Sequence, residues 1–435
     1  MRRRQVLQAL AGTMLPCTLA ACDSKEPDVV VVGAGAAGLS TARTLLGAGL
    51  SVIVLEAEGR IGGRAFTETK TFGFPYDRGC HWLHHASTNP WIAYGLNNGF
   101  DVHQDNGESF ILEDGRAYQG KKLNEFEEAL ASILESAWNN SRGKPDAPFS
   151  SYFDDENVWS PTIESMIVND WYGLELSDIS TEYIMLEDED NDWLCAQGFG
   201  SLVAHYGRNL PVRTSVEVRR IDWSGTGVKV HTTDGLLRAR AVVVTASTGV
   251  LASDQIAFLP SLPTQKVESF NAFPMGSYNH IALRYSNDVF ELGPNAYVVP
   301  FATDKREAGL LSNANGRNLV MIYVGGDLSW ELERMGVDEA ISYGVDYIDT
   351  LLGTDTRKNF VNGTFTLWGQ NRWTLGSYAA AAPGGLSFRE VLRQPVGNRI
   401  FFAGDACHTE GSSSAARAYE TGIEAAASVL NAIRV

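Results

Sequence analysis

The sequence has 435 residues, of which 44% are hydrophobic and 20% are charged, a composition typical of a globular protein with two domains. Its 35 Lys and Arg residues stand against 52 Asp and Glu residues, which gives a formal charge of −17. This surplus repels phosphate backbones, so no nucleic-acid partner is expected.

The first 22 residues are typical of a targeting segment. Arginines at positions 2–4 fit a twin-arginine signal, and the apolar stretch Ala9–Leu19 that follows is too short to span a bilayer. The stretch ends in Leu-Ala-Ala-Cys, which resembles a bacterial lipoprotein cleavage site with a lipidated Cys22, whereas ordinary cleavage near Ala21 is the alternative. We expect export of the folded protein to the periplasm or the outer face of the inner membrane, either free or anchored through Cys22.

A strand, a glycine-rich turn and a helix come next. Asp28–Val32 is an apolar run of strand length, and a helical pattern follows the turn at 33–38 and ends at Gly47. A second apolar strand, Ser51–Leu55, leads directly into Glu56. These elements predict one βαβ unit of a parallel sheet.

The glycines of this turn, Gly33-Ala34-Gly35-Ala36-Ala37-Gly38, have separate roles. Gly33 allows the sharp bend, Gly35 and the following Ala36 let the helix N-terminus approach a pyrophosphate, and Gly38 lets the helix pack on the strand. Glu56 places a carboxylate where it can accept hydrogen bonds from ribose hydroxyls. The pattern predicts a dinucleotide site, and by itself it does not distinguish NAD from FAD.

The rest of the chain predicts a second, interleaved lobe. Residues from about 86 to 190 are expected to form helices and loops, with the clearest helix at 124–139. Further strands are expected at 212–218, 228–232, 241–246, 279–285, 319–324 and 399–405, and further helices at 338–352 and 415–432. The apolar run 241–246 is expected to join the first sheet.

We therefore expect an α/β protein in which a Rossmann-like FAD-binding domain is interleaved with an α+β substrate-binding domain. The FAD-binding domain is assigned to 28–85, 195–268 and 391–435, and the substrate-binding domain to 86–194 and 269–390. The widely spaced Cys80, Cys195 and Cys407 suggest no structural disulfide.

Several further motifs point to one family. Arg60-Ile-Gly-Gly-Arg64 forms a second glycine-rich turn just after Glu56. The other motifs stand at 76–84 (YDRGCHWLH), 198–203 (GFGSLV), 242–246 (VVVTA), 368–369 (WG), 373–378 (WTLGSY) and 402–405 (FAGD). With these motifs the mature chain resembles the flavin-dependent amine oxidases, a group that contains monoamine oxidases, polyamine oxidases and lysine-specific histone demethylases.

The resemblance implies a role for each motif in holding FAD. Glu56 would bind the adenosine ribose, Gly63 and Arg64 the pyrophosphate side, and the backbone of Val218 the adenine. Asp405 would meet the pyrophosphate and ribityl region. The remaining implied positions are His81 and Trp82 beside the flavin, Trp373 near its ring, and Ser414 and Ala415 at the start of the last helix, facing the pyrimidine ring.

The resemblance also implies the reaction, which is hydride transfer from the carbon next to an amine nitrogen to flavin N5. The resulting imine then hydrolyses to an aldehyde and an amine or ammonia. Trp368 and Tyr378 would belong to the active site, with Tyr378 as one wall of an aromatic cage whose other wall falls on the non-aromatic Ser414. Ser377 stands where monoamine oxidases carry the cysteine that bonds to the flavin, so non-covalent FAD is expected. A polyamine or other alkylamine is the expected substrate.

One departure from the family leaves the electron acceptor open. His280 stands where the family has a lysine that holds a water against flavin N5, and a histidine there can also hold a water and can exchange a proton near neutral pH. It could equally be a structural strand histidine. The acceptor is therefore either O2 or a periplasmic electron carrier.

Two other functions remain as alternatives at this stage. An L-amino-acid oxidase would need an arginine that grips a carboxylate, for which Arg284 and Arg372 are candidates. A lipid-anchored electron-transfer or partner-binding flavoprotein is the second alternative. The acidic run 187–192 is expected to be solvated rather than to bind substrate, and His84 and His85 are expected to be loop histidines without a metal.

Overall fold

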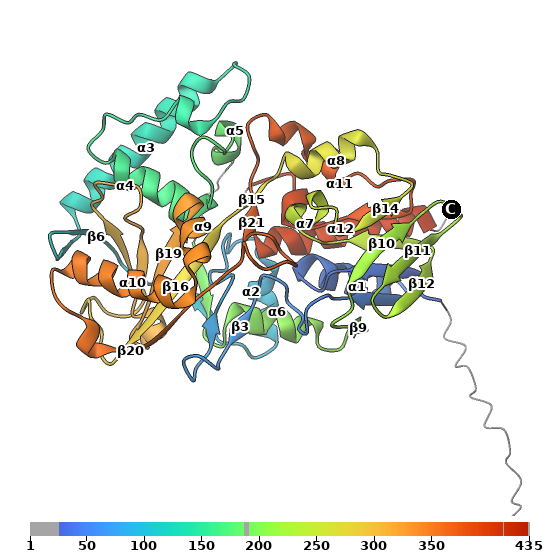
Figure 1. Ribbon diagram of the computed structural model, residues 1–435, viewed down its shortest axis with the longest axis horizontal. Coiled ribbons are helices and arrows are strands. Elements are labelled where there is room, and N and C mark those ends of the chain that lie inside the picture. The colour runs from blue at the N-terminus through green and yellow to red at the C-terminus, as the bar shows by residue number, and fades with distance from the viewer. Residues whose placement is uncertain (1–25, 187–190, 412, 434–435) are drawn as a thin grey trace, which may run out of the picture.

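The computed structural model describes residues 26–186, 191–411 and 413–433 (Figure 1). The expected signal segment, including Cys22, and residues 187–190 of the acidic run lie outside the described residues. In Figure 1 a large sheet with α10 (Val337–Leu352) lies to the left, and two smaller sheets with α1 (Ala36–Gly47) and α12 (Ala415–Ile433) lie to the right.

The glycine-rich turn lies in a five-stranded parallel sheet. Its strands, in spatial order, are β22 (Ile400–Phe402), β13 (Ala241–Val244), β1 (Val29–Val32), β2 (Val52–Leu55) and β9 (Val212–Arg213). The four valines of β1 are buried, as expected for a parallel strand covered on both faces. The expected pairing of 241–246 with the first strand is confirmed, because Val29 pairs with Ala241 on one side and with Val52 on the other.

Helices α1 and α12 pack closely on each other beside this sheet. The Ser40 hydroxyl donates to the Tyr419 carbonyl and the Thr41 hydroxyl donates to the Gly422 carbonyl. A Cβ added to Gly422 would lie 2.0 Å from Ser40 Oγ, so only glycine permits this approach. The contact fixes the N-terminus of α12 relative to the glycine-rich turn that precedes α1.

The expected strand at 212–218 is wrong as a single strand. It divides into β9, which joins the parallel sheet, and the start of β10 (Val218–Asp222), which belongs to another sheet. Between them Ser215 has a φ of +59°, which an extended strand does not contain. The second sheet has the order β12 (Gly235–Ala239), β11 (Val228–Thr232), β10, β14 (Ala257–Leu259).

A seven-stranded sheet forms the centre of the other lobe. Its order is β20 (Phe360–Phe365), β16 (Tyr278–Tyr285), β19 (Leu319–Gly325), β18 (Leu310–Ser312), β17 (Ala296–Pro300), β6 (Ser109–Glu113) and β7 (Arg116–Tyr118). The strands β6 and β7 correct the expectation of helices and loops throughout 86–190. They were missed because β6 is short and pairs with β17, which is remote in sequence, so no local pattern reveals the partner.

The predicted helices at 124–139, 338–352 and 415–432 are confirmed as α3 (Lys121–Ser141), α10 and α12. The remaining α-helices are α2 (Pro90–Asn97), α4 (Ser160–Ser165), α5 (Thr181–Ile184), α6 (Phe199–Gly207), α7 (Thr248–Ala252), α8 (Thr264–Asn271), α9 (Gly326–Met335) and α11 (Arg389–Arg393). Short strand pairs are β3 (Thr67–Glu68) with β4 (Tyr76–Asp77), β5 (Val102–Gln104) with β8 (Trp193–Cys195), and β15 (Met275–Gly276) with β21 (Tyr378–Ala379).

The expected fold class is confirmed, since the chain passes repeatedly between the two lobes. Strands of the parallel sheet fall within 28–85, 195–268 and 391–435, and those of the seven-stranded sheet within 86–194 and 269–390. The limits assigned to the two domains remain a prediction. Cys80, Cys195 and Cys407 are free thiols. Within the described ranges no helix is long and apolar enough to cross a membrane.

Candidate active site

The first glycine-rich turn has little room for side chains. Gly33 has a φ of +102°, and a Cβ there would lie 2.5 Å from Thr245 Oγ1. A Cβ on Gly38 would lie 2.0 Å from the Gly33 carbonyl oxygen. At Gly35, in contrast, a Cβ would meet only the Gly63 Cα, at 4.0 Å, so the side of the turn that faces the expected pyrophosphate is open.

The start of α1 is well suited to an anion. No side chain caps its N-terminus at Gly35, and its first turn contains no acidic residue. The N–H groups there are therefore free of competing side chains, and the helix dipole favours negative charge at this end.

The second glycine-rich turn packs directly on the first. The Gly62 N–H donates to the Ala34 carbonyl at 2.8 Å, and Gly35 forms an isolated parallel bridge with Gly62. Both Gly62 and Gly63 have positive φ, at +104° and +58°. The two turns thus form one continuous backbone cradle.

Glu56 is buried at the end of β2, beside this cradle. Its carboxylate accepts the Ala34 N–H at 2.7 Å with one oxygen and the Glu58 N–H at 2.8 Å with the other. Burial raises the pKa of Glu56, and the two backbone N–H groups partly oppose that rise. Each oxygen keeps a further lone pair, as binding of ribose hydroxyls requires.

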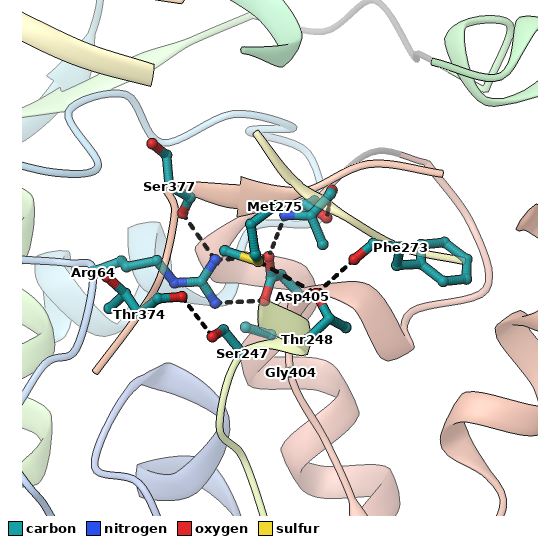
Figure 2. A network of polar contacts seen from close by, with 12 residues as sticks. Arg64, Ser247, Thr248, Phe273, Met275, Thr374, Ser377, Gly404 and Asp405 are labelled. Atoms are coloured by element: carbon teal, nitrogen blue, oxygen red, sulfur yellow. Dashed lines mark hydrogen bonds and ion pairs between the residues drawn. The ribbon is translucent and has the colours of Figure 1, made fainter. Parts of the chain in front are cut away.

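Arg64 and Asp405 form a two-pronged ion pair (Figure 2). The guanidinium donates to the two carboxylate oxygens at 2.6 and 2.9 Å and also to the Ser377 carbonyl at 2.8 Å. Burial alone would raise the pKa of Asp405, but the charge and hydrogen bonds of Arg64 outweigh it and lower the pKa. The ion pair therefore links three segments of the chain: the second turn, the strand β21 and the segment after β22.

A channel of about 200 Å³ runs along these groups. It is lined by eleven of the expected FAD residues: Gly33, Gly35, Ala36, Glu56, Gly63, Arg64, Val218, Trp373, Asp405, Ser414 and Ala415. These residues fit FAD. Glu56 would bind the ribose, the glycine cradle with the helix N-terminus would bind the pyrophosphate, and the backbone near Val218 would contact the adenine. Gly38 does not line the channel, in agreement with a packing role.

A second cavity of about 630 Å³ opens beside the channel. The two share the residues Arg64, Cys80, Ser377, Tyr378, Ser413, Ser414 and Ala415. The larger cavity is also lined by the predicted residues His81, Trp82, His280 and Trp368. A cofactor in the channel would therefore present one end to this cavity, which is suited to hold the substrate.

The N-terminus of α12 lies at this junction. Ser414 precedes the helix and accepts the Arg417 N–H at 3.1 Å, as an N-cap residue does. The first turn of α12 contains no acidic residue. The helix dipole therefore favours negative charge at the end of the cofactor that meets the cavity.

Two sequence motifs meet through Asp77, which precedes His81 and Trp82. Its carboxylate accepts the N–H groups of Phe199 and Gly200, at the start of α6, and also lies 3.5 Å from His81 Nδ1. Trp82 is held in place by donation from its indole N–H to Asp105 at 2.9 Å. The motif at 76–84 is thus fixed against the motif at 198–203.

Tyr378 stands at the boundary between channel and cavity. Its hydroxyl donates to the Trp171 carbonyl at 2.8 Å, and its ring lies 5.5 Å from that of Tyr278. The neighbouring Ser377 hydroxyl donates to the Tyr278 carbonyl and accepts its N–H, both at 2.7 Å. Position 377 carries no thiol, so a cysteinyl bond to the flavin cannot form there.

His280 lies between aromatic rings on the wall of the larger cavity. It is 3% exposed, the rings of Tyr278 and Tyr323 lie 5.3 Å from it, and its Nδ1 has no hydrogen-bond partner within the described part of the chain. Burial, assisted by the charge of His81, lowers the pKa of His280 to about 3. A neutral imidazole at physiological pH favours the structural strand histidine over proton exchange, and the role of His280 stays a prediction.

The larger cavity is acidic. Three carboxylates line it, from Asp105, Asp170 and Asp192, whereas Arg64 is the only lysine or arginine among its described lining residues. Because Arg64 is paired with Asp405, the described lining offers no unpaired lysine or arginine to an anionic substrate.

Neither arginine suggested for an amino-acid carboxylate lines this cavity. Arg284 donates to the Phe72 carbonyl at 3.1 Å, and Arg372 pairs with Glu217 at 3.2 Å while it stacks on Trp373. His84, in turn, is ion-paired with Asp192 at 2.8 Å. Among the residues with described positions no cluster of three metal-binding side chains exists.

Several residues of the cavity wall were not predicted from the sequence, namely Asp105, Asp170, Trp171, Tyr278, Tyr297 and Tyr323. A signal was available for Tyr278, which lies two residues before His280 on the same strand and therefore shares its face. The others come from separate elements that only the tertiary fold brings together.

The chain is similar to known amine-oxidising flavoproteins over nearly its whole length. A family model described as flavin containing amine oxidoreductase matches residues 36–156 and 112–430. Polyamine oxidase 2 of Arabidopsis thaliana is 29% identical over 93% of this chain and 88% of that protein. Lysine-specific histone demethylase 2 of Homo sapiens is 22% identical over 94% of this chain and 54% of its own length.

Solved structures show the same fold. Wild-type putrescine oxidase bound to putrescine superposes with a TM-score of 0.79 at 20% identity, over 93% of this chain and 99% of that one. Cyclohexylamine oxidase from Brevibacterium oxydans IH-35A gives a TM-score of 0.78 at 23% identity, over 94% of this chain and all of that one.

Proposed function

This chain belongs to the flavin-containing amine oxidoreductases, and on that premise we propose that it oxidises a polyamine or another alkylamine. It is an FAD-dependent enzyme that acts on amines. When bound, FAD supplies the acceptor for the hydride that leaves the carbon next to the amine nitrogen. The imine so formed is hydrolysed by water.

The observation that carries the choice of substrate is the make-up of the larger cavity. It combines tyrosine and tryptophan walls with three carboxylates, and the one arginine among its described lining residues is already paired. Such a site attracts a cationic alkylamine and repels a carboxylate. The names of the related plant enzymes, which are polyamine oxidases, support the same class.

The walls next to the channel serve a second purpose. An ammonium cannot readily lose a hydride, so the reacting nitrogen must be neutral. The rings of Tyr378 and Trp171 line the cavity on that side, and desolvation against aromatic rings disfavours the charged form of an amine. These residues thus favour the reactive form while the carboxylates attract the charged one.

The proposal is tested by anaerobic mixing of the purified holoprotein with a panel of amines. We expect polyamines and alkylamines to bleach the flavin absorbance, and L-amino acids to leave it unchanged, because no unpaired arginine is found among the described residues that line the cavity. If no amine bleaches the flavin, the proposed function is wrong. Bleaching by L-amino acids alone would instead support the amino-acid oxidase alternative.

The acceptor is proposed to be O2 or a periplasmic electron carrier, and His280 offers a test. We expect His280→Lys to speed reoxidation in air by about tenfold, because a cation there would stabilise the negative charge that develops on reduced oxygen. The burial that lowers the pKa of His280 also acts on the new lysine, but a lysine starts from a pKa of about 10 and so retains charge near neutral pH.

Stopped-flow reoxidation of the reduced protein measures this effect. His103→Lys is the matched control, since His103 is exposed, pairs with Asp101 and lines neither cavity. An unchanged reoxidation rate in His280→Lys would show that the residue at position 280 plays no part in the oxidative half-reaction.

We also propose that the enzyme works outside the cytoplasm. The arginines at positions 2–4 and the short apolar stretch after them support twin-arginine export. This route carries folded proteins and therefore suits a chain that acquires its flavin before export. Anchoring through Cys22 would keep it at the membrane surface.

A further inference from the structure

We propose that Asp170 selects substrates with a second ammonium group, which its carboxylate binds while the first amine is oxidised beside Tyr378. This inference rests on the proposed amine oxidation and adds to it the residue that distinguishes an α,ω-diamine or polyamine from a monoamine.

Asp170 reaches the cavity because of an irregular helix. The segment Met166–Tyr172 is π-helical, with more residues per turn than an α-helix, and Met166, Asp170 and Trp171 all line the cavity. The segment ends at Gly173, whose φ is +65° and where a Cβ would lie 2.7 Å from the Ser277 carbonyl oxygen. π-helical turns are rare and occur frequently at functional sites, so the side chains of this turn that line the cavity are candidates for substrate binding.

The same turn places Asp170 close to the reacting end. The Trp171 carbonyl accepts the hydroxyl of Tyr378, which stands at the boundary with the FAD channel. Asp170 is thus the immediate neighbour in sequence of the residue whose carbonyl anchors Tyr378, and both side chains belong to residues that line the same cavity.

Of the three carboxylates, Asp170 is the one with a buried oxygen that lacks a hydrogen-bond partner among the described residues. Asp105 accepts the indole N–H of Trp82 with one oxygen and the Gly107 N–H with the other. Asp192 is half-exposed at the rim and paired with His84. Asp170 accepts the Tyr297 hydroxyl through Oδ2, whereas its buried Oδ1 has no hydrogen-bond partner in the described structure.

A second polar group nearby points to a ligand as well. Tyr323 is 1% exposed and lines the same cavity, and its buried hydroxyl also lacks a partner in the part of the chain described. Its ring lies 6.5 Å from that of Tyr297, which holds Asp170. Buried polar groups are normally paired, so two such groups on one cavity wall indicate a polar ligand.

The charges around Asp170 favour a cation as that ligand. The titratable groups that face it from β16, β17, β19 and α10 are the phenols of Tyr278, Tyr297, Tyr323 and Tyr347, and burial keeps the pKa of each well above its usual value. None of these groups carries a positive charge. Burial raises the pKa of Asp170 itself to about 7, so an ammonium group would restore its ionised form.

The test compares diamines with monoamines of the same length, namely 1,4-diaminobutane with n-butylamine and 1,6-diaminohexane with n-hexylamine. We expect Asp170→Asn to lower kcat/KM for the diamines by about 30-fold, the size of a charged hydrogen bond, and for the monoamines by less than about threefold. Anaerobic flavin bleaching should show a weaker Kd for the diamine with little change in the limiting rate. Asp178→Asn removes an exposed carboxylate a few residues further along the chain and is the matched control.

Tyr297→Phe provides a second variant in case Asp170→Asn folds poorly. It keeps the carboxylate but removes its hydrogen-bond donor, so the pKa of Asp170 rises further. We expect its diamine preference to be lost near pH 7 and recovered above pH 8, because the carboxyl must ionise to bind an ammonium.

The outcomes separate the inference from the function on which it rests. A diamine-to-monoamine ratio equal to that of the wild type in both variants would overturn the role of Asp170 and leave amine oxidation intact. A wild-type enzyme that oxidises monoamines as well as diamines would do the same. A wild-type enzyme that oxidises no amine would overturn both.

Discussion

Gly38→Ala is expected to yield a protein that retains less than about a tenth of its FAD. The new Cβ would lie 2.0 Å from the Gly33 carbonyl oxygen, so α1 must move away from the glycine-rich turn. That movement displaces the helix N-terminus and the backbone at Gly35, which together form the pyrophosphate cradle. Overpacking of this kind costs about 1–3 kcal/mol, and a comparable loss of binding energy weakens FAD affinity by about 10- to 100-fold.

The ratio of flavin to protein absorbance after desalting measures the effect. Gly47→Ala is the matched control, since Gly47 ends the same helix and a Cβ there meets no atom within 4 Å. The control should keep its full flavin content. A Gly38→Ala protein that also retains full flavin would show that the contact between α1 and the turn does not determine binding.

The cofactor half of the site could be predicted from the sequence because its signals are local. Gly33, Gly35 and Gly38 follow an apolar strand directly, and Glu56 ends the next strand, so spacing alone indicates the geometry. Arg64 and Asp405 lie far apart in sequence, and only the family resemblance linked them. The structure joins them in a direct ion pair.

The substrate half could not be predicted in the same way. Its walls come from the π-helical segment and from β16, β17 and β19, which meet only through the pairing of distant strands. A π-helical turn also has no clear sequence pattern. The sequence around Asp170 therefore does not indicate that its side chain belongs to the cavity wall. The titration of His280 depends on burial between Tyr278 and Tyr323, which no local motif reports.

Asp405→Asn is expected to lower the melting temperature of the holoprotein by about 4 °C. The substitution leaves Arg64 without its carboxylate, and loss of one partner of a buried ion pair costs about 3 kcal/mol or more. Thermal unfolding followed by tryptophan fluorescence measures the change. Asp346→Asn is the control, because its pair with Arg357 is exposed and such pairs contribute little, so a shift below about 1 °C is expected there.

The pH dependence of this stability difference shows whether it comes from the charge of the ion pair or from packing. The lowered pKa of Asp405 means that its contribution is complete above the unfolded value of 3.8 and is lost as the pH falls through the folded value. The difference between wild type and Asp405→Asn should therefore be constant from pH 7 to about pH 5 and shrink below pH 4. The double variant Arg64→Met with Asp405→Leu should recover part of the stability, since it removes both charges. A difference that persists unchanged at low pH would assign the effect to packing and leave the charge of Asp405 without a role in stability.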